Sequence, residues 1–154
     1  MPAAYLLVGS NILPEENIPL AISMLSALGK IQAISTTWEN PPVGSSGSNF
    51  YNLAICLETD LPVDRLKGEL RSIEHRLGRI RSADKYAPRT MDLDILIYDD
   101  VLVEPRIWNQ PFAVVPLAEL LPEYRDPSYP KSLSELAREI RENNAFKPRN
   151  EAPW

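Results

Sequence analysis

The sequence is poor in the residues that form disulfides and most transition-metal centres. Its 154 residues include a single cysteine and a single histidine, so no disulfide can form within the chain. Cys56 lies inside an apolar, strand-like run, which is typical of a buried thiol rather than of a nucleophile or a metal ligand. His75 falls in the middle of an expected helix, and we assign it no role.

Long hydrophobic runs are also missing near the N-terminus. The apolar run at residues 3–8 is too short for a membrane span or a signal peptide, and no basic residue precedes it. We therefore expect a cytoplasmic protein without a membrane partner.

An excess of positive charge is the third absence. The formal net charge is −5, which argues against binding long nucleic acids through a basic surface. Yet eight of the 16 lysines and arginines lie between Arg65 and Arg89, with three acidic residues among them. This local patch indicates a small anionic ligand, although a solvated basic helix face is the alternative reading.

Length and composition predict one domain. At 154 residues with 44% hydrophobic content, the chain can bury a sizeable core, roughly 70% of its unfolded surface. It shows no internal repeat and no linker, so we expect a single domain over 1–154. Residues 143–154 are expected to form a loosely held tail.

The most informative stretch is a predicted strand at residues 91–98. Apolar residues occupy every second position: Met91, Leu93, Ile95 and Ile97. Asp92 and Asp94 should therefore project together from the opposite face, roughly 7 Å apart. Two carboxylates at that spacing favour a hard cation such as Mg²⁺, and Arg89 adds a planar fork suited to phosphate. A solvated strand with a chance Asp-x-Asp triplet is the alternative.

The remaining elements follow from periodicity and turn residues. Strands are predicted at 3–8, 30–39, 50–58 and 101–103, the last after a tight turn at Asp99-Asp100. A helix over 18–25 should have Pro19 in its first turn and Gly29 at its C-terminal cap, and a second helix is predicted over 62–78. Residues 112–121 are expected to hold a short strand and a helical turn, and residues 133–142 a helix. This order predicts an α+β, ferredoxin-like sandwich: an antiparallel sheet with two helices on one face, and a short C-terminal extension.

Several motifs together resemble one known family. Residues 85–96 match its signature of a basic residue, a small residue, Pro-Arg, and Asp-aliphatic-Asp followed by two aliphatic residues. Around this signature, in the family's order, lie the following: Gly9-Ser10-Asn11, Pro41-Pro42-Val43-Gly44, Asn49-Phe50-Tyr51-Asn52, Glu74, Gly78-Arg79-Ile80-Arg81, and Phe112 ahead of Pro116-Leu117. From about residue 5 to 122 the chain resembles 6-hydroxymethyl-7,8-dihydropterin pyrophosphokinase, a folate-pathway family that moves diphosphate from ATP to a pterin alcohol and releases AMP.

The resemblance implies a nucleotide and metal site. Asp92 and Asp94 would hold two Mg²⁺ ions that bridge the ATP phosphates. Arg79 and Arg89 would contact the nucleotide and stabilise developing charge, Glu74 would lie near the nucleotide, and Lys85 would be a weaker phosphate contact.

The resemblance also implies a pterin site. Phe50 and Phe112 would sandwich the flat ring, and Asn52 would read its amide-like edge together with the backbone of the neighbouring loop. The loop residues concerned are Asn40, Pro42 and Val43. For both phenylalanines, plain core packing is the alternative.

The chain departs from the family at residues 104–112. This stretch is shorter than in many members, lacks their histidine, and has Gln110 in the approximate place of an arginine. We therefore expect weaker binding of ATP, with Trp108 either stacking on a ligand or packing without a ligand role. A non-catalytic relative that binds pterin or nucleotide is the main alternative. A ferredoxin-like RNA-binding module fits an acidic chain poorly. We expect small-molecule partners only and a monomer.

Overall fold

The structure is a computed structural model that describes residues 1–42, 47–79, 89–143 and 146–149. Its centre is a seven-stranded sheet in the order β6-β5-β1-β4-β3-β7, with β2 also paired to β4, and every pairing is antiparallel. The strands are β1 Ala3–Ser10, β2 Lys30–Ile34, β3 Trp38–Asn40, β4 Phe50–Glu58, β5 Asp92–Tyr98, β6 Val101–Leu102 and β7 Lys147–Pro148. The helices are α1 Pro14–Leu25, α2 Val63–Arg76, the 3₁₀ helix η1 Pro105–Asn109, α3 Pro111–Leu120 and α4 Leu133–Asn143.

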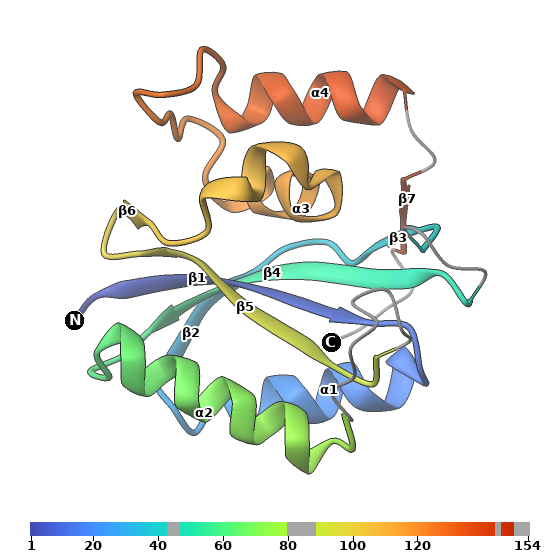
Figure 1. Ribbon diagram of the computed structural model, residues 1–154, viewed down its shortest axis with the longest axis vertical. Helices are drawn as coiled ribbons and strands as arrows, with labels where there is room; N and C mark the ends of the chain where they lie inside the picture. Colours follow the sequence, from blue (N-terminus) through green and yellow to red (C-terminus); the bar gives the residue numbers. More distant parts are fainter. Residues whose placement is uncertain (43–46, 80–88, 144–145, 150–154) are drawn as a thin grey trace.

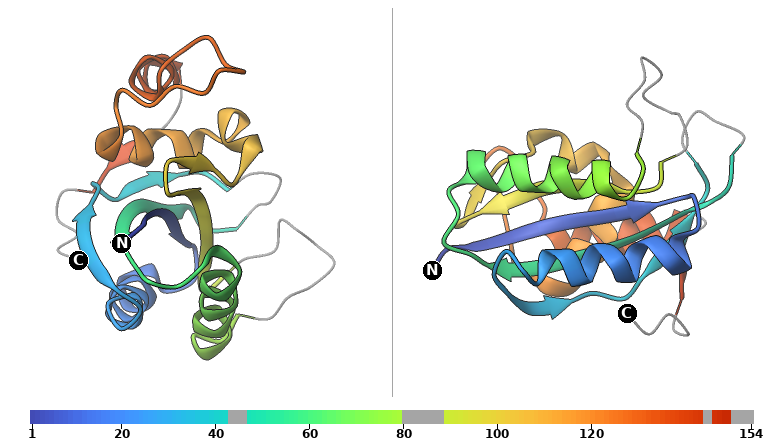
Figure 2. Two further views of the ribbon diagram at one scale, coloured as in Figure 1. Left: turned by 90° about the vertical axis from the view of Figure 1, so that its left-hand side faces the viewer. Right: turned by 90° about the horizontal axis from the view of Figure 1, so that it is seen from below.

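Helices cover both faces of the sheet. α1 and α2 lie side by side on one face, α3 covers the other, and α4 packs outside α3 (Figures 1 and 2). One buried cluster fills the space between the sheet and the first helix pair, and a second fills the space under α3 and α4. The predicted ferredoxin-like arrangement is confirmed, and the C-terminal extension adds a helical layer on the opposite face.

The α2 helix and the β4 strand fold as their periodicity predicts. Leu66, Leu70 and Ile73 step along one face of α2 and are buried against the sheet. β4 covers residues 50–58, the predicted range. The Asp99-Asp100 turn is also confirmed, because both residues have positive φ, 50° and 64°, the conformation that two-residue hairpins require.

β5 keeps its predicted alternation only as far as Ile95. Tyr5 of β1 pairs with Ile97 while the next residue, Leu6, pairs with Ile95, so Leu96 is an extra residue, a β-bulge. Leu93 and Ile95 lie in the cluster under α1 and α2, whereas Ile97 lies in the cluster under α3. Ile97 was predicted to lie on the same face of the sheet as Leu93 and Ile95. That prediction was wrong, because one inserted residue turns the side chains that follow it to the opposite face.

Boundaries near α1 also differ from the prediction. The helix begins at Pro14, after Leu13 in the left-handed conformation (φ 45°), so Pro19 lies in the second turn rather than the first. Gly29 is not the helix cap. A Cβ at Gly29 would lie 2.0 Å from the carbonyl oxygen of Glu58, so glycine is needed there for close approach of the chain to β4.

Two further segments differ from the prediction in the elements that they form. The single strand predicted at 30–39 is two strands, β2 and β3, both paired with β4. Residues 111–120 form one helix, α3, with no strand. Most of α3 is buried, and a helix enclosed on most sides shows no polar face by which periodicity could identify it.

Part of the segment expected to be a tail takes part in the sheet. β7 pairs with β3, with Glu39 opposite Lys147 and Trp38 opposite Pro148. Within the described residues, no helix is both long and apolar enough to cross a membrane.

Candidate active site

The candidate site lies at the edge of β5 that faces away from β1. β6 pairs with β5 only at Ile97 and Tyr98, so the stretch from Asp92 to Ile95 has no strand neighbour on this side among the described residues. α2 approaches this edge from one face of the sheet, and η1 and the start of α3 approach from the other (Figure 1). The edge is therefore open to side chains from both layers.

Asp92 is held between two arginines. Arg79 Nη1 donates to Asp92 Oδ1 at 3.1 Å, and Arg89 Nη1 donates to Asp92 Oδ2 at 3.0 Å. Arg79 reaches this position because Gly78, with φ +88°, reverses the chain after α2, a conformation that favours glycine. Each carboxylate oxygen retains a further lone pair after these hydrogen bonds, so Asp92 can still bind a cation.

Glu74 organises the cluster from within the protein. It is only 2% exposed, and its Oε2 accepts hydrogen bonds from Arg79 Nη1 at 2.7 Å and from the backbone N of Leu93 at 2.8 Å. Arg71 Nη1 donates to its Oε1 at 3.3 Å. Glu74 thus satisfies a backbone donor at the open edge of β5 and orients Arg79 at the same time.

Asp94 has a strongly perturbed environment. Burial raises its pKa from 3.8 to about 7, with further contributions from the charges of Asp92 and Glu74, against the opposing effect of Arg71 and Arg79. Such a carboxylate gains from a bound cation. No group of three or more potential ligands among Asp, Glu, His and Cys occurs in the described part of the chain. A pair of carboxylates suits Mg²⁺, which takes its other ligands from water and substrate phosphate.

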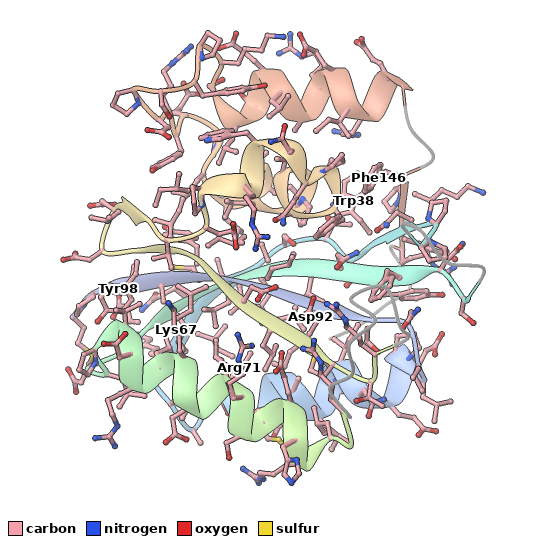
Figure 3. The ribbon with its side chains drawn as sticks, viewed as in Figure 1. Trp38, Lys67, Arg71, Asp92, Tyr98 and Phe146 are labelled. Carbon is pink, nitrogen blue, oxygen red and sulfur yellow. The ribbon has the colours of Figure 1, made fainter. Side chains whose placement is uncertain are left out.

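A cavity of about 260 Å³ opens beside these carboxylates. It is lined by Arg71, Arg79, Arg89, Asp92, Asp94, Glu104, Arg106, Gln110 and Phe112. A second cavity of about 150 Å³ continues along α2 to Lys67 and shares Arg71, Asp94 and Glu104 with the first. Figure 3 shows Lys67 and Arg71 on the side of α2 nearest β5, and Asp92 near the start of that strand. Four arginines and three carboxylates line the larger cavity, a combination that suits a phosphate-bearing ligand that carries a divalent cation.

Arg106 is a cavity residue that the sequence analysis missed. Its Nε donates to Glu104 Oε1 at 2.9 Å and its Nη2 donates to Oε2 at 3.1 Å. These hydrogen bonds hold the pKa of Glu104 below its usual range. Gln110 occupies the approximate place of the family's arginine, but Arg106 provides a cation in the same short segment.

Asn11 is a second missed residue. It is 4% exposed, and its Oδ1 accepts from the backbone N of Arg89 at 2.7 Å while its own backbone N donates to the Arg89 carbonyl at 3.1 Å. Its Nδ2 also donates to the carbonyl of Ser48 at 3.3 Å. Asn11 therefore fixes the backbone of Arg89 to the end of β1. In the sequence, Asn11 was recognised only as part of the Gly9-Ser10-Asn11 motif, without a role of its own.

The residues expected to recognise the pterin edge come together at the junction of β3 and β4. Asn52 is 4% exposed and donates from Nδ2 to Asn40 Oδ1 at 2.8 Å, while Asn40 donates to the carbonyl of Pro41 at 3.0 Å. A Cβ at Gly9 would lie 2.6 Å from Asn52 Oδ1. The lack of a side chain at Gly9 therefore makes room for the Asn52 amide.

The two phenylalanines lie on different elements. Phe50 begins β4 opposite Asn40 and is partly buried. Phe112 lies in the first turn of α3, lines the larger cavity and packs partly against the second core cluster. Pro42 is partly buried just after β3, whereas Val43 and Lys85 lie outside the described residues.

Trp108 has packing partners. Its ring stacks on Tyr129 with centroids 4.7 Å apart and on Tyr124 at 6.5 Å, and it is not among the residues that line the two cavities. Of the two readings of Trp108, the structure supports packing within the C-terminal layer.

The fold and this site define a ferredoxin-like domain that presents paired carboxylates and several arginines to one cavity. Residues 5–122 match the model of the 7,8-dihydro-6-hydroxymethylpterin-pyrophosphokinase (HPPK) family, and the chain belongs to that family. A relative from Aquifex aeolicus, named 2-amino-4-hydroxy-6-hydroxymethyldihydropteridine pyrophosphokinase, is 32% identical and is covered over 96% of both chains. A Synechocystis relative of the same name is 31% identical over 86% of this chain and 73% of its own length.

Solved structures agree on the fold. A crystal structure of Plasmodium falciparum HPPK-DHPS superposes on 90% of this chain with a TM-score of 0.69 at 13% identity. This chain spans 43% of that longer protein.

Proposed function

We propose that this protein transfers a diphosphate from ATP to the hydroxymethyl group of 6-hydroxymethyl-7,8-dihydropterin and releases AMP, as a step of folate biosynthesis. Membership of the pyrophosphokinase family supports the reaction. The observation that carries the assignment of the site is the pairing of Asp92 and Asp94 with Arg79 and Arg89 at one cavity.

In this proposal Asp92 and Asp94 would hold two Mg²⁺ ions. Bound there, the metal neutralises negative charge on the ATP phosphates and helps to align them. The raised pKa of Asp94 supports a cation at this position, because a nearby positive charge would offset both the burial and the repulsion from Asp92 and Glu74 that disfavour its ionised form.

The arginines supply the remaining positive charge. In the transfer, the hydroxymethyl oxygen loses its proton to water and bonds to the β-phosphorus. The bond from that phosphorus to the oxygen bridging toward the α-phosphorus breaks. AMP leaves with the bridging oxygen. The Arg79 guanidinium donates to Glu74. Asn11 fixes the backbone of Arg89, and Asp92 accepts a hydrogen bond from the Arg89 guanidinium. Both guanidinium groups are therefore preorganised for charge that develops on the phosphates.

The pterin would bind between the cavity and the β3–β4 junction. Asn52 would read its amide-like edge with Asn40 and Pro42 beside it, and Phe50 and Phe112 would stack on the ring faces. Because Asn52 is buried and fixed to Asn40, its amide presents a defined donor and acceptor pattern. Val43 and Lys85 remain proposed contacts to the pterin and to ATP respectively.

The test is AMP formation from Mg-ATP with and without added 6-hydroxymethyl-7,8-dihydropterin. We expect AMP only when the pterin is present, and Asp92→Asn should lower the rate by roughly a thousandfold or more, since a metal ligand is lost. The matched control is Asp60→Asn, at an exposed carboxylate between β4 and α2, which should leave the rate unchanged. Tight binding of ATP by the wild type without pterin-dependent AMP would refute catalysis and indicate a non-catalytic relative.

A further inference from the structure

The C-terminal segment 146–149 lies beyond the family match and docks beside the proposed pterin residues. β7 pairs with β3, and the backbone N of Arg149 donates to the Thr37 carbonyl at 2.8 Å. Phe146 packs against the same core cluster as Trp38, and both are labelled in Figure 3. β3 is thereby held on its outer edge by a segment far away in the sequence.

A side-chain network reinforces this contact. Arg149 Nη1 donates to Glu39 Oε1 at 2.7 Å, and Asn49 Nδ2 donates to Glu39 Oε2 at 3.0 Å. The Arg149 guanidinium also lies over the Tyr51 ring, 5.3 Å from its centroid, within the range of a cation–π contact. Arg149 is only 33% exposed in its side chain and Glu39 only 19%, so this pair is less screened by solvent than a surface pair.

The network adjoins the proposed pterin site on both strands. Glu39 directly precedes Asn40, and Asn49 directly precedes Phe50. Asn40 and Phe50 are register partners, and Asn40 holds the Asn52 amide. β3 has only three residues, so its pairing with β4 is short, and β7 supports it on the other side. A displacement of about 1 Å at a recognition residue can cost two orders of magnitude in rate.

We propose that residues 146–149 act as a strap that positions the pterin site, with Arg149 acting through Glu39 and Asn49 to hold Asn40 and Phe50 in register. The inference rests on the proposed function and adds to it a specific role for the C-terminal segment. Arg149 is a positioning residue here, since the residues it contacts are neighbours of the proposed pterin ligands.

The experiment measures pterin and nucleotide affinity separately in the full-length protein. Arg149→Gln should raise the dissociation constant for 6-hydroxymethyl-7,8-dihydropterin about 5- to 20-fold, as expected when a side chain in one hydrogen-bonded network is removed. Its affinity for a non-hydrolysable Mg-ATP analogue should change by less than about twofold, because the nucleotide residues lie on other elements. Arg149→Lys retains the charge and should restore part of the pterin affinity.

Two further variants separate positioning from general stability. Asn49→Ser breaks the inner link of the network without touching β7, so pterin affinity should fall while the melting temperature stays unchanged. Arg125→Gln is the matched control, because Arg125 also pairs with a glutamate, Glu135, at 2.6 Å but lies at an exposed position before α4. Arg125→Gln should leave the affinities for the pterin and for the Mg-ATP analogue unchanged.

Unchanged pterin affinity in both Arg149→Gln and Asn49→Ser, in a wild type that turns over, would overturn the positioning role alone. Equal weakening of both ligands by Arg149→Gln would also overturn it, since that pattern indicates a general loss of structure. If the wild type forms no pterin-dependent AMP, the proposed function fails and this inference fails with it.

Discussion

Replacing Asp94 by asparagine should stabilise the metal-free protein while destroying its activity. The folded environment raises the pKa of Asp94 from 3.8 to about 7, which means that its ionised form is disfavoured in the folded state. Asparagine is nearly the same size and carries no charge. The substitution therefore removes a cost of folding at neutral and alkaline pH.

The sign and size of the effect depend on pH. Below about pH 3.8 the carboxyl is neutral in both states, and the raised pKa costs nothing. Between pH 3.8 and about pH 7, Asp94 is ionised in the unfolded chain but keeps its proton in the folded protein, so the free energy of unfolding falls as the pH rises. The full cost is reached above pH 7. A difference of about three units at about 1.4 kcal/mol per unit gives about 4 kcal/mol.

The measurement is the free energy of unfolding of wild type and Asp94→Asn in chelator at pH 5 and pH 8. We expect the variant to be more stable at pH 8 by roughly 2 to 4 kcal/mol, and at pH 5, about one unit above the unfolded pKa, by roughly half as much or less. Mg²⁺ with a non-hydrolysable ATP analogue should raise the melting temperature of the wild type at pH 8. It should have little effect on the variant, which lacks one carboxylate.

Asp92→Asn is the control of opposite sign. Asp92 accepts charge-assisted hydrogen bonds from Arg79 and Arg89, so removing its charge should destabilise the protein by roughly 1 to 3 kcal/mol. If Asp94→Asn is instead destabilising at pH 8 in chelator, or if its effect does not differ between pH 5 and pH 8, the reasoning about Asp94 is refuted.

Four other substitutions address the rest of the site. Asn52→Ala should weaken pterin binding by roughly 1 to 3 kcal/mol through an unpaired amide edge and leave ATP binding nearly unchanged, as measured by calorimetry; equal weakening of both ligands would remove Asn52 from the pterin site. Gly9→Ala should also weaken pterin binding selectively, because its Cβ would lie 2.6 Å from the Asn52 Oδ1, and unchanged affinity would show that the Asn52 amide moves freely. Arg106→Gln should weaken binding of the Mg-ATP analogue about 5-fold or more, whereas Gln110→Ala should change it less, since a charged donor interacts with phosphate more strongly than an amide; the reverse order would assign the nucleotide contact to Gln110.

The parts of the fold that follow from sequence are those with a local physical cause. α2 could be placed because its apolar residues recur every three or four positions against one face of the sheet. The orientation of Asp92 and Asp94 followed from Met91, Leu93 and Ile95, all three buried in one cluster. Periodicity of this kind depends only on the element itself and the side it buries.

The misassigned parts depend on contacts distant in the chain. The bulge at Leu96 arises from register with β1, and no residue type near Leu96 marks it. α3 is buried on most sides, so its sequence has no polar stripe. β7 exists because β3 offers a free edge about 110 residues earlier, as the contact from Arg149 to Glu39 shows. None of these features can be derived from a short window of sequence.

The hydrogen bonds that end β6 explain both why the site is open and why Arg106 was overlooked. After the turn at Asp99-Asp100, the backbone N atoms of Val103 and Glu104 both donate to the Leu96 carbonyl, at 2.9 and 3.2 Å. β6 therefore ends after two residues, and Pro105 begins η1, which leads away from the rest of β5. A longer hairpin would cover the edge at which Glu74 accepts the Leu93 N–H, next to Asp94. The early end of β6 thus leaves the carboxylates accessible and places Arg106 at the cavity, so a short connecting segment is compatible with a cationic site.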